Sequence, residues 1–327
     1  MSDTMATVSD PMGVSGDAPI DTSADAHPLT PHVALNRVIM LVNPLSGSVG
    51  PRAAGEAEAL LSNYACEATV VALEGGKFDE QIQEAIDACP DVLFVLAGDG
   101  TAGTIASRAG PNGPLVAPLP GGTMNMLPRA LYGTADWKLA LKRALEEGAP
   151  QPVAGGEVTD GEFKQAFYCA AIFGSPALWA PAREAMRTGK VKLAWMHARR
   201  ALKRAFSGRL RFSLDGRAER RAEALVLISP MISKAMEENT GLEAAAMNPS
   251  DAMEAFRLAA HAVMDDWRQD PAVTTRSTQK VAIRARSRIP AVIDGEPTQL
   301  RHEAKVRFIA KAFQALAPLP PAAEDAV

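Results

Sequence analysis

A carboxylate between two glycines is the first feature of this sequence that could do chemistry. Asp99 stands in Gly98-Asp99-Gly100-Thr101, directly after the apolar run Val92–Leu96, which is typical of a buried strand. We expect a helix to follow, with Thr101 as its N-cap, so that free backbone N–H groups favour an anion there. A carboxylate beside a phosphate repels it unless a cation bridges the two or the acid takes part in the reaction. The alternative is a plain strand-to-helix turn in which Asp99 only caps the helix.

Two further loops carry polar groups that suit the same ligand. Asn43-Pro44-Leu45-Ser46-Gly47 follows the apolar run Arg37–Val42, and Gly121-Gly122-Thr123-Met124-Asn125 follows Leu115–Pro118. Their amides and hydroxyls can donate hydrogen bonds to phosphate or ribose oxygens without adding charge. Taken alone, the first loop is equally consistent with a structural turn. The second could fix a crevice, cap the next helix, or do both.

A second acidic feature lies some two hundred residues after the first, in Asp294-Gly295-Glu296. An Asp-Gly pair after an apolar run is the usual signal of a tight hairpin turn. Taken alone, this turn is consistent with a solvated loop. A carboxylate on it could also accept a proton from an attacking hydroxyl, provided that the fold brings it to the substrate.

The elements that must position these loops alternate between strand and helix. We expect strands at Arg37–Val42, Ala68–Leu73, Val92–Leu96 and Leu115–Pro118. The helices expected between and after them are Pro51–Tyr64, Phe78–Ala88, Thr101–Ala109, Met126–Leu131 and Trp137–Glu147. This order predicts a parallel sheet, whose ligands bind at the carboxyl ends of its strands. The three loops should therefore converge on one crevice.

The pattern changes after about Pro150. Longer alternating runs predict an antiparallel or sandwich-like, β-rich second domain, with strands at Gln165–Phe173, Leu210–Leu214, Ala222–Ile228, Gln279–Arg286 and Val306–Ile309. We expect one helix within it, at Ser250–Arg268, and little structure in Ala315–Pro321. The predicted organisation is a disordered tail (1–35), an α/β nucleotide-binding domain (36–150), a β-rich lipid or substrate domain (151–318) and a flexible end (319–327).

Composition narrows the class of protein. The chain has 327 residues, 47% hydrophobic content and a net charge of −4, and five aspartates with no basic residue precede Arg37, so the remainder is close to neutral. The cysteines Cys66, Cys89 and Cys169 have no paired or metal-ligand spacing, which suits a reducing compartment. No run is long enough to span a membrane, and no signal peptide is evident. We expect a cytoplasmic protein.

Together, the motifs carry more information than any one of them. Asn-Pro-x-Ser-Gly, Gly-Asp-Gly-Thr, Gly-Thr-x-Asn-x-x-x-Arg and a late Asp-Gly-Glu, in this order and spacing, resemble the diacylglycerol kinase catalytic family. That family includes bacterial lipid kinases and the sphingosine and ceramide kinases, and the resemblance covers roughly Arg37 to Pro318. It implies an α/β nucleotide domain similar to that of NAD kinases, a β-rich lipid domain, and transfer of the γ-phosphoryl group of ATP, with Mg²⁺, to a lipid hydroxyl.

The resemblance also implies roles for individual residues. Glu296 would accept the proton of the attacking hydroxyl, with Asp294 as the other candidate. Asp99 would lie near the ATP phosphates through a metal ion or ordered water, although in some branches the acid at this position is itself the base. The nucleotide would be bound by residues of the three loops: Asn43, Pro44, Ser46, Gly47, Ala97, Gly98, Asp99, Gly100, Thr101, Gly122, Thr123 and Asn125.

Two positions depart from the family pattern. Ala97 replaces the first glycine of Gly-Gly-Asp-Gly-Thr, which is tolerable if that backbone is not left-handed. Thr240 stands where members with a second, structural Mg²⁺ carry an acid, and hard cations prefer charged oxygens, so we do not expect that metal site here. Arg52 and Arg129 are candidates for neutralising phosphate charge, although each is also consistent with a surface cation.

Residues 183–221 form a strongly basic segment, with thirteen basic and three acidic side chains. Within it, Val191–Phe206 has a helical pattern that places Trp195 and Phe206 opposite the basic residues, as suits an anionic membrane surface. A domain-packing helix with a solvated polar face is the alternative. Nucleic acid is not favoured because the aromatic residues are not interleaved as in base-stacking platforms.

The leading hypothesis is therefore an ATP-dependent lipid kinase that meets its substrate at the inner face of the membrane. A soluble nucleotide kinase of the NAD kinase type is the second hypothesis, and a non-catalytic regulator that binds lipid or nucleotide is the third. The sequence does not indicate which lipid is the acceptor or how many subunits assemble.

Overall fold

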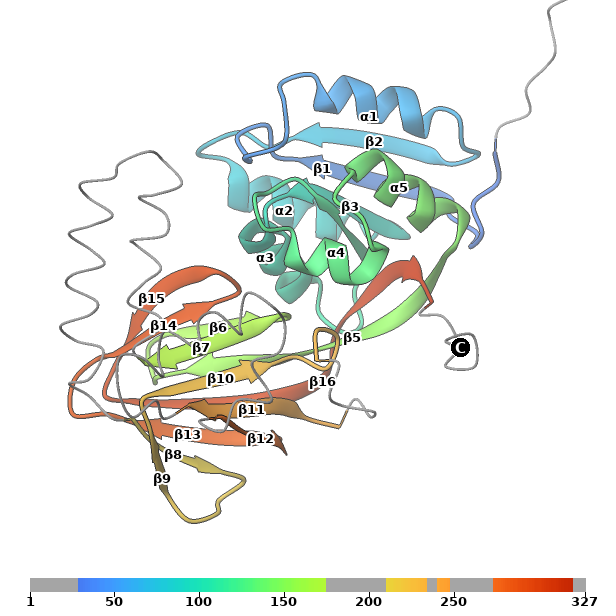
Figure 1. Ribbon diagram of the computed structural model, residues 1–327. Helices are drawn as coiled ribbons and strands as arrows, with labels where there is room; N and C mark the ends of the chain where they lie inside the picture. The colour runs from blue at the N-terminus through green and yellow to red at the C-terminus, as the bar shows by residue number, and fades with distance from the viewer. Residues whose placement is uncertain (1–28, 175–209, 234–239, 248–272, 320–327) are drawn as a thin grey trace, which may run out of the picture.

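Short apolar runs form the centre of the first sheet, because side chains buried on both faces of a parallel strand must all be apolar. The computed structural model describes residues 29–174, 210–233, 240–247 and 273–319. In it, β1 (Arg37–Val42), β3 (Val92–Ala97) and β4 (Leu115–Pro120) pair in parallel, with β2 (Glu67–Ala72) on the outer edge. Every residue of β3 is buried. The predicted parallel sheet is confirmed (Figure 1).

Helices cover both faces of this sheet. They are α1 (Ala53–Leu61), α2 (Phe78–Asp87), α3 (Asp99–Ala109), α4 (Met126–Tyr132) and α5 (Trp137–Glu146). Helices α1 and α5 bury apolar residues against one face, and α2 and α3 against the other. Successive strand residues point to opposite faces, so each strand contributes to both cores.

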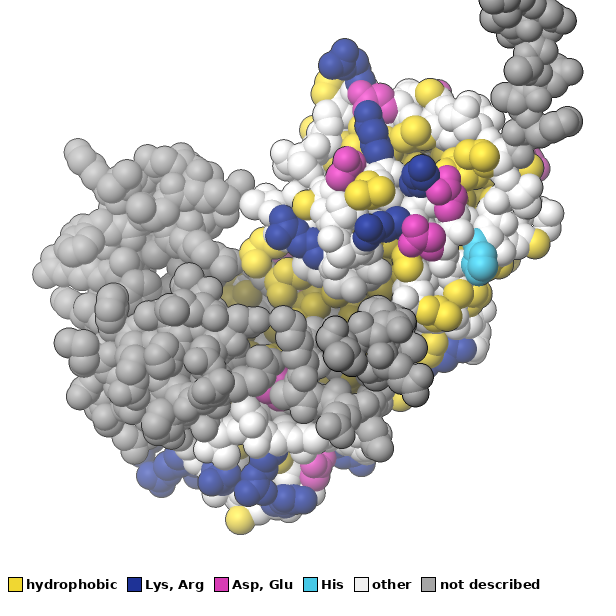
Figure 2. All heavy atoms as spheres, turned by 45° about the vertical axis from the view of Figure 1, so that its right-hand side comes forward, with side chains coloured by type: hydrophobic (Ala, Val, Ile, Leu, Met, Phe, Trp, Pro, Cys, Tyr) yellow, Lys and Arg dark blue, Asp and Glu magenta, His cyan; other side chains and the backbone are white. Residues whose placement is uncertain are grey.

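The later half of the chain builds two antiparallel layers. A six-stranded sheet has the order β12-β11-β10-β7-β14-β15, while β13, β8 and β9 extend the first sheet beyond β16. The six strands are β7 (Ala170–Gly174), β10 (Ala224–Ile228), β11 (Leu242–Met247), β12 (Val273–Thr278), β14 (Ile289–Ile293) and β15 (Glu296–Leu300). The others are β5 (Gly148–Thr159), β6 (Lys164–Phe167), β8 (Leu210–Leu214), β9 (Arg220–Ala222), β13 (Lys280–Arg284) and β16 (Glu303–Pro318). Lys and Arg side chains gather at the end where β8 and β9 lie (Figure 2).

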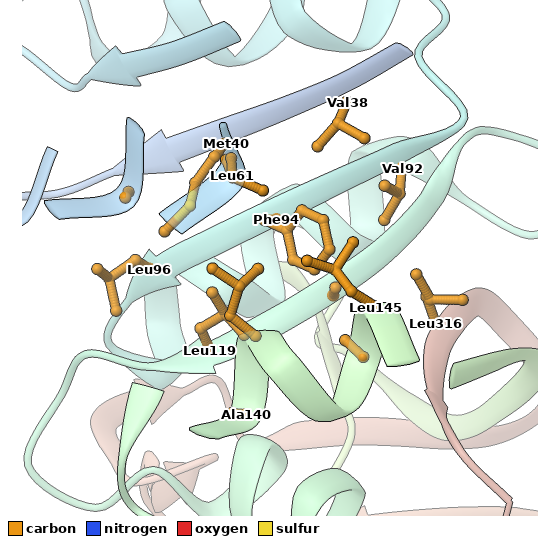
Figure 3. Close-up of a cluster of buried hydrophobic side chains, with 14 of the residues drawn as sticks. Val38, Met40, Leu61, Val92, Phe94, Leu96, Leu119, Ala140, Leu145 and Leu316 are labelled. Atoms are coloured by element: carbon orange, nitrogen blue, oxygen red, sulfur yellow. The ribbon is translucent and has the colours of Figure 1, made fainter. Parts of the chain in front are cut away.

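Distinct cores lie within each half. One fills the α1–α5 side of the parallel sheet, where Met40 lies beside Leu61 and Phe94 beside Leu145 (Figure 3). Another lies between the two layers of the second half, where Phe173 of the six-stranded sheet and Phe212 of the larger sheet are both buried. The predicted β-rich, sandwich-like second region is confirmed.

Strand β16 joins the two halves, and its length corrects the sequence analysis. Little structure was expected from Ala315 on, yet β16 runs from Glu303 to Pro318, with Ala315 paired to Val116 of β4. Along most of this length β16 also pairs with β5, which crosses the expected domain boundary at residue 150. The final residues of β16 therefore complete the first sheet, because their pairing partners lie far away in the sequence.

Other boundaries also differ from expectation. The predicted strand Gln165–Phe173 is broken at Tyr168 and Cys169 into β6 and β7. Residues 29–35, expected to be disordered, pack on the first domain: Leu29 bridges Tyr64 and Leu35 is buried. The rest of the expected tail, most of the basic segment 183–221 and the predicted helix Ser250–Arg268 lie outside the described residues.

Candidate active site

The N-cap of helix α3 lies three residues earlier than predicted. Gly98, not Thr101, is the N-cap, and Asp99 is the first helical residue. Gly98 is extended, and a Cβ there would lie 3.7 Å from the Cα of Gly122. The reverse approach is closer, since a Cβ on Gly122 would lie 2.7 Å from the Cα of Gly98. Glycines thus let two loops touch through their backbones at the start of α3, where the first N–H groups of the helix are free.

Hydrogen bonds join the three predicted loops into one structure. The backbone N–H of Gly98 donates to Ser46 Oγ at 3.2 Å, and Ser48 Oγ donates to the carbonyl of Gly122 at 3.2 Å. Ala97 ends β3 with its carbonyl accepting the N–H of Gly121 at 3.1 Å. Ala97 is not among the described residues with positive φ, so its methyl group causes no backbone strain.

Two asparagines shape the outer loops. Asn43 Oδ1 accepts the N–H of Leu45 at 3.1 Å, which closes a turn beside Pro44. Asn125 is left-handed (φ 50°) and buried, and its side chain bonds both backbone groups of Gly122, at 2.7 and 3.0 Å. Asn125 occupies the N-cap position of α4 but makes no side-chain capping bond, so it fixes the loop rather than the helix.

The Asp99 carboxylate lies between α3 and the start of α4. Asp99 Oδ1 accepts the N–H of Leu127 at 3.3 Å. Burial raises the pKa of Asp99, opposed by the N–H groups at the start of α4 and by the charge of Arg129. Asp99 therefore accepts hydrogen bonds from the start of α4 rather than capping its own helix. Arg52 is exposed at the start of α1.

Asp294 is held by three successive backbone N–H groups. The donors are Tyr168 at 2.7 Å to Oδ2, and Cys169 and Ala170 at 2.9 Å each to Oδ1. Asp294 is itself left-handed, with φ 44°, as a tight turn before Gly295 requires. Burial raises the pKa of Asp294 to about 6, helped by the nearby charge of Asp99, while the three N–H donors oppose this rise.

Glu296 is exposed at the start of β15, and its carboxylate lies over the first turn of α3. A Cβ on Gly100 would overlap Glu296 Oε1 and lie 3.1 Å from Cδ. Met124 of the third loop lies beside the late acidic turn, since its Sδ would be 3.9 Å from a Cβ on Gly295. The structure thus brings the late acidic turn to the Gly-Asp-Gly-Thr loop.

A cleft of about 310 Å³ opens at this meeting point. The three acids Asp99, Asp294 and Glu296 line one part of it, and α3 and the strands β5 and β6 line the rest. The described residues contain no group of three or more His, Cys, Asp and Glu side chains arranged to hold a metal ion. The arrangement suits a cation bound partly by ligand phosphates, since Mg²⁺ commonly uses one or two carboxylates and keeps several waters.

Thr240 stands at the position where some family members carry an acid for a second metal ion. It borders a separate cleft of about 450 Å³ with Asp215. Asp215 Oδ1 already accepts the backbone N–H groups of Gln279 and Lys280, at 2.9 Å each. The carbonyl of Thr240 accepts a hydrogen bond from Gln279 Nε2 at 3.1 Å.

Sequence analysis missed some residues that hold the site together. Ser48 bonds Gly122, and the backbone of Tyr168 to Ala170 binds Asp294. Ser48 stands just past the first motif and could have been included by its residue type. The amides of Tyr168 to Ala170 leave no signal in side-chain composition.

Residues 37–158 match the family model of the diacylglycerol kinase catalytic domain. This segment belongs to the diacylglycerol kinase catalytic-domain family. It contains all three loops, while the acidic turn at Asp294 lies outside the matched range. No curated protein sequence matches the chain significantly.

Solved structures share the fold of this chain. A diacylglycerol kinase from Bacillus anthracis str. Sterne superimposes with a TM-score of 0.62 at 14% identity, covering 88% of this chain and 98% of that chain. A second structure from the same organism gives 0.66 at 15% identity, covering 88% and 99%. Yeast NADH kinase complexed with NADH gives 0.50 at 13% identity, covering 88% and 85%. At these identities the likeness shows the fold alone.

Proposed function

We propose that this protein is an ATP-dependent lipid kinase that transfers the γ-phosphoryl group to a lipid hydroxyl. The observation that carries this proposal is the contact between Glu296 and Gly100, which brings a carboxylate of the second half onto the start of α3. A phosphoryl donor at the loops and a hydroxyl acceptor beside Glu296 would then share one cleft. The family match to residues 37–158 supports a kinase, and the lipid acceptor is our inference from the second half of the chain.

The donor side fits the polyphosphate of ATP. The first N–H groups of α3 have no partner within the helix and can bind an anion. In the first loop, Gly47 leaves space beside Thr123, since a Cβ on Gly47 would lie 3.2 Å from Thr123 Oγ1. Thr123 is exposed and Ser46 partly buried at this rim. Bound Mg²⁺ would neutralise developing phosphate charge, and Asp99 is the residue placed to hold it, directly or through water.

On the acceptor side the geometry favours Glu296 over Asp294 as the base. Both Asp294 oxygens are already bonded to backbone N–H groups, whereas the Glu296 carboxylate is exposed to the cleft. Glu296 would accept the hydroxyl proton as the hydroxyl oxygen bonds to the γ-phosphorus and the bond to the β-phosphate bridging oxygen breaks. The proton then passes from Glu296 to solvent, and ADP leaves with the bridging oxygen.

A lipid acceptor requires contact with a membrane. Among the described residues, no helix is long and apolar enough to cross one. Within the described part of the basic segment 183–221, Arg211, Arg217 and Arg220 are exposed on and beside β8 and β9. Basic side chains gather at this end of the molecule (Figure 2). We propose that this surface meets anionic lipid from the cytoplasmic side, because clustered basic residues are attracted to the negative inner leaflet.

A mass-resolved phosphorylation screen tests the function directly. Purified protein, ATP and Mg²⁺ are incubated with a whole lipid extract in detergent micelles, and in parallel with NAD in plain buffer. We expect one or more lipids to gain the mass of a phosphoryl group and NAD to be unchanged. NAD phosphorylation without lipid would support a nucleotide kinase instead, and ATP binding without any turnover would support a regulator.

A further inference from the structure

Tyr168 lies at the junction of the two halves of the cleft, between the end of β6 and the start of β7. Its backbone N–H binds Asp294 Oδ2 at 2.7 Å, the shortest of the three amide bonds that fix the acidic turn. The break in the strand is what makes this possible, because three successive N–H groups of a regular strand would alternate in direction. The backbone of Tyr168 therefore helps to hold the acidic turn, on the acceptor side of the cleft.

The ring of Tyr168 packs against α3, on the donor side of the cleft. It fits into a slot between two glycines: a Cβ on Gly155 of β5 would lie 3.0 Å from Cδ1, and a Cβ on Gly103 of α3 would lie 3.7 Å from Cε2. Phe313 of β16 closes the slot with an edge-on contact, with ring centroids 5.1 Å apart. Only 2% of Tyr168 is exposed. The ring thus contacts the helix that begins with Asp99 and Gly100.

The same residue therefore touches both sides of the proposed reaction. Gly103 is one turn along α3 from Gly100, over which the Glu296 carboxylate lies, and Asp294 begins the turn that carries Glu296. A rigid aromatic ring between closely packed backbones sets a fixed spacing, because well-packed interiors deform little. Removal of the ring would let α3 and the acidic turn shift relative to each other.

We propose that Tyr168 is a positioning residue that sets the spacing between the phosphate-binding end of α3 and the Glu296 carboxylate. This inference rests on the proposed function, because it concerns the same cleft. The ring, not the hydroxyl, performs the task. Within the described residues the buried hydroxyl makes no hydrogen bond of standard geometry, and burial raises the pKa of the phenol, which the nearby Ser107 hydroxyl opposes.

Three substitutions test this role. Tyr168→Leu removes the ring, Tyr168→Phe keeps it, and Phe212→Leu removes a buried ring from the separate core between the two layers. We expect Tyr168→Leu to lower kcat about tenfold to a hundredfold, because small displacements of reacting groups have large effects on rate. The Kd for ATP should stay within about twofold, since the three loops are intact. Tyr168→Phe should keep the turnover of the wild type. Phe212→Leu should lower the stability of the protein and leave kcat unchanged.

Hydrogen exchange gives a readout that does not depend on turnover. Tyr168→Leu should accelerate exchange at the amides of residues 168–170, whereas Phe212→Leu should not. Equal kcat in Tyr168→Leu and Phe212→Leu would overturn the inference, as would an equal loss in Tyr168→Phe. If Tyr168→Leu does not fold, Gly103→Val reaches the same contact from α3 and should show the same kcat loss. A wild-type protein that binds ATP but phosphorylates no lipid contradicts the proposed function, and the exchange experiment still tests the coupling.

Discussion

Gly100 is the point where the two halves of the proposed site touch. Replacing it with alanine should lower turnover without lowering stability. A Cβ there would overlap Glu296 Oε1 and lie 3.1 Å from Cδ. Because Glu296 is exposed, its carboxylate would move aside, by on the order of 1 Å, without disturbing the fold. Such a shift of a reacting group is expected to lower kcat about 100-fold.

Gly103→Ala provides the matched control, since it is the same substitution three residues further along α3. Its Cβ would lie at an ordinary contact distance of 3.7 Å from the Tyr168 ring. In a helix interior, alanine is more favourable than glycine by roughly 0.5–1 kcal/mol, which raises Tm by about 2 °C in a protein of this size. Gly103→Ala should therefore be slightly more stable and fully active.

The assay measures lipid phosphorylation and thermal unfolding for both variants and the wild type. We expect Gly100→Ala to keep a Tm at or above that of the wild type while losing turnover. Wild-type turnover in Gly100→Ala would refute the reasoning, because it would show that the position of the Glu296 carboxylate over α3 does not matter to the reaction.

Three other predictions follow from the site. The pKa of Asp294 is raised to about 6 from an ordinary 3.8, so the folded state holds its proton more tightly than the unfolded state. The resulting contribution to the free energy of unfolding, roughly 3 kcal/mol, is complete below pH 4 and is lost as the pH rises through 6. Chemical denaturation from pH 4 to 7 should therefore show this pH dependence in the wild type and not in Asp294→Asn. Ser46→Ala removes the acceptor of the Gly98 N–H and should lower the free energy of unfolding by about 0.5–1.5 kcal/mol, as measured by urea denaturation, with unchanged stability contradicting the bond. Cosedimentation with anionic vesicles should fall as salt is raised, and salt-independent binding would argue against the basic surface as the membrane contact.

Much of the first half could be predicted from the sequence, because its signals are local. Val92–Leu96 is apolar throughout, and such a run is stable only when both faces of the strand are covered. Once the strands are parallel, the loops after β1, β3 and β4 must meet at one edge of the sheet, and hydrogen bonds such as Gly98 to Ser46 confirm that they do. The predicted N-cap of α3 was wrong because glycine can cap a helix about as well as threonine can. The close approach of the Gly122 backbone to Gly98 favours the earlier position.

What could not be predicted depends on partners far apart in the chain. The end of β16 looks unstructured because Ala315–Pro318 has no strong strand formers, and it is ordered by pairing with β4 and β5. The amide groups that hold Asp294 could not be predicted, because they lie 124 to 126 residues earlier. The resemblance to a known family placed Glu296 at the cleft, and the structure brings it to Gly100.

The most direct test of the central claim is lipid phosphorylation by Glu296→Gln compared with the wild type, at equal occupancy by ATP. Glutamine has nearly the same shape as glutamate but cannot take up the hydroxyl proton. We predict that Glu296→Gln binds ATP with unchanged affinity, keeps its Tm, and loses kcat by about 10²–10⁴-fold, the usual contribution of a general base. Turnover at the wild-type rate by Glu296→Gln would contradict the claim that this carboxylate is the proton acceptor.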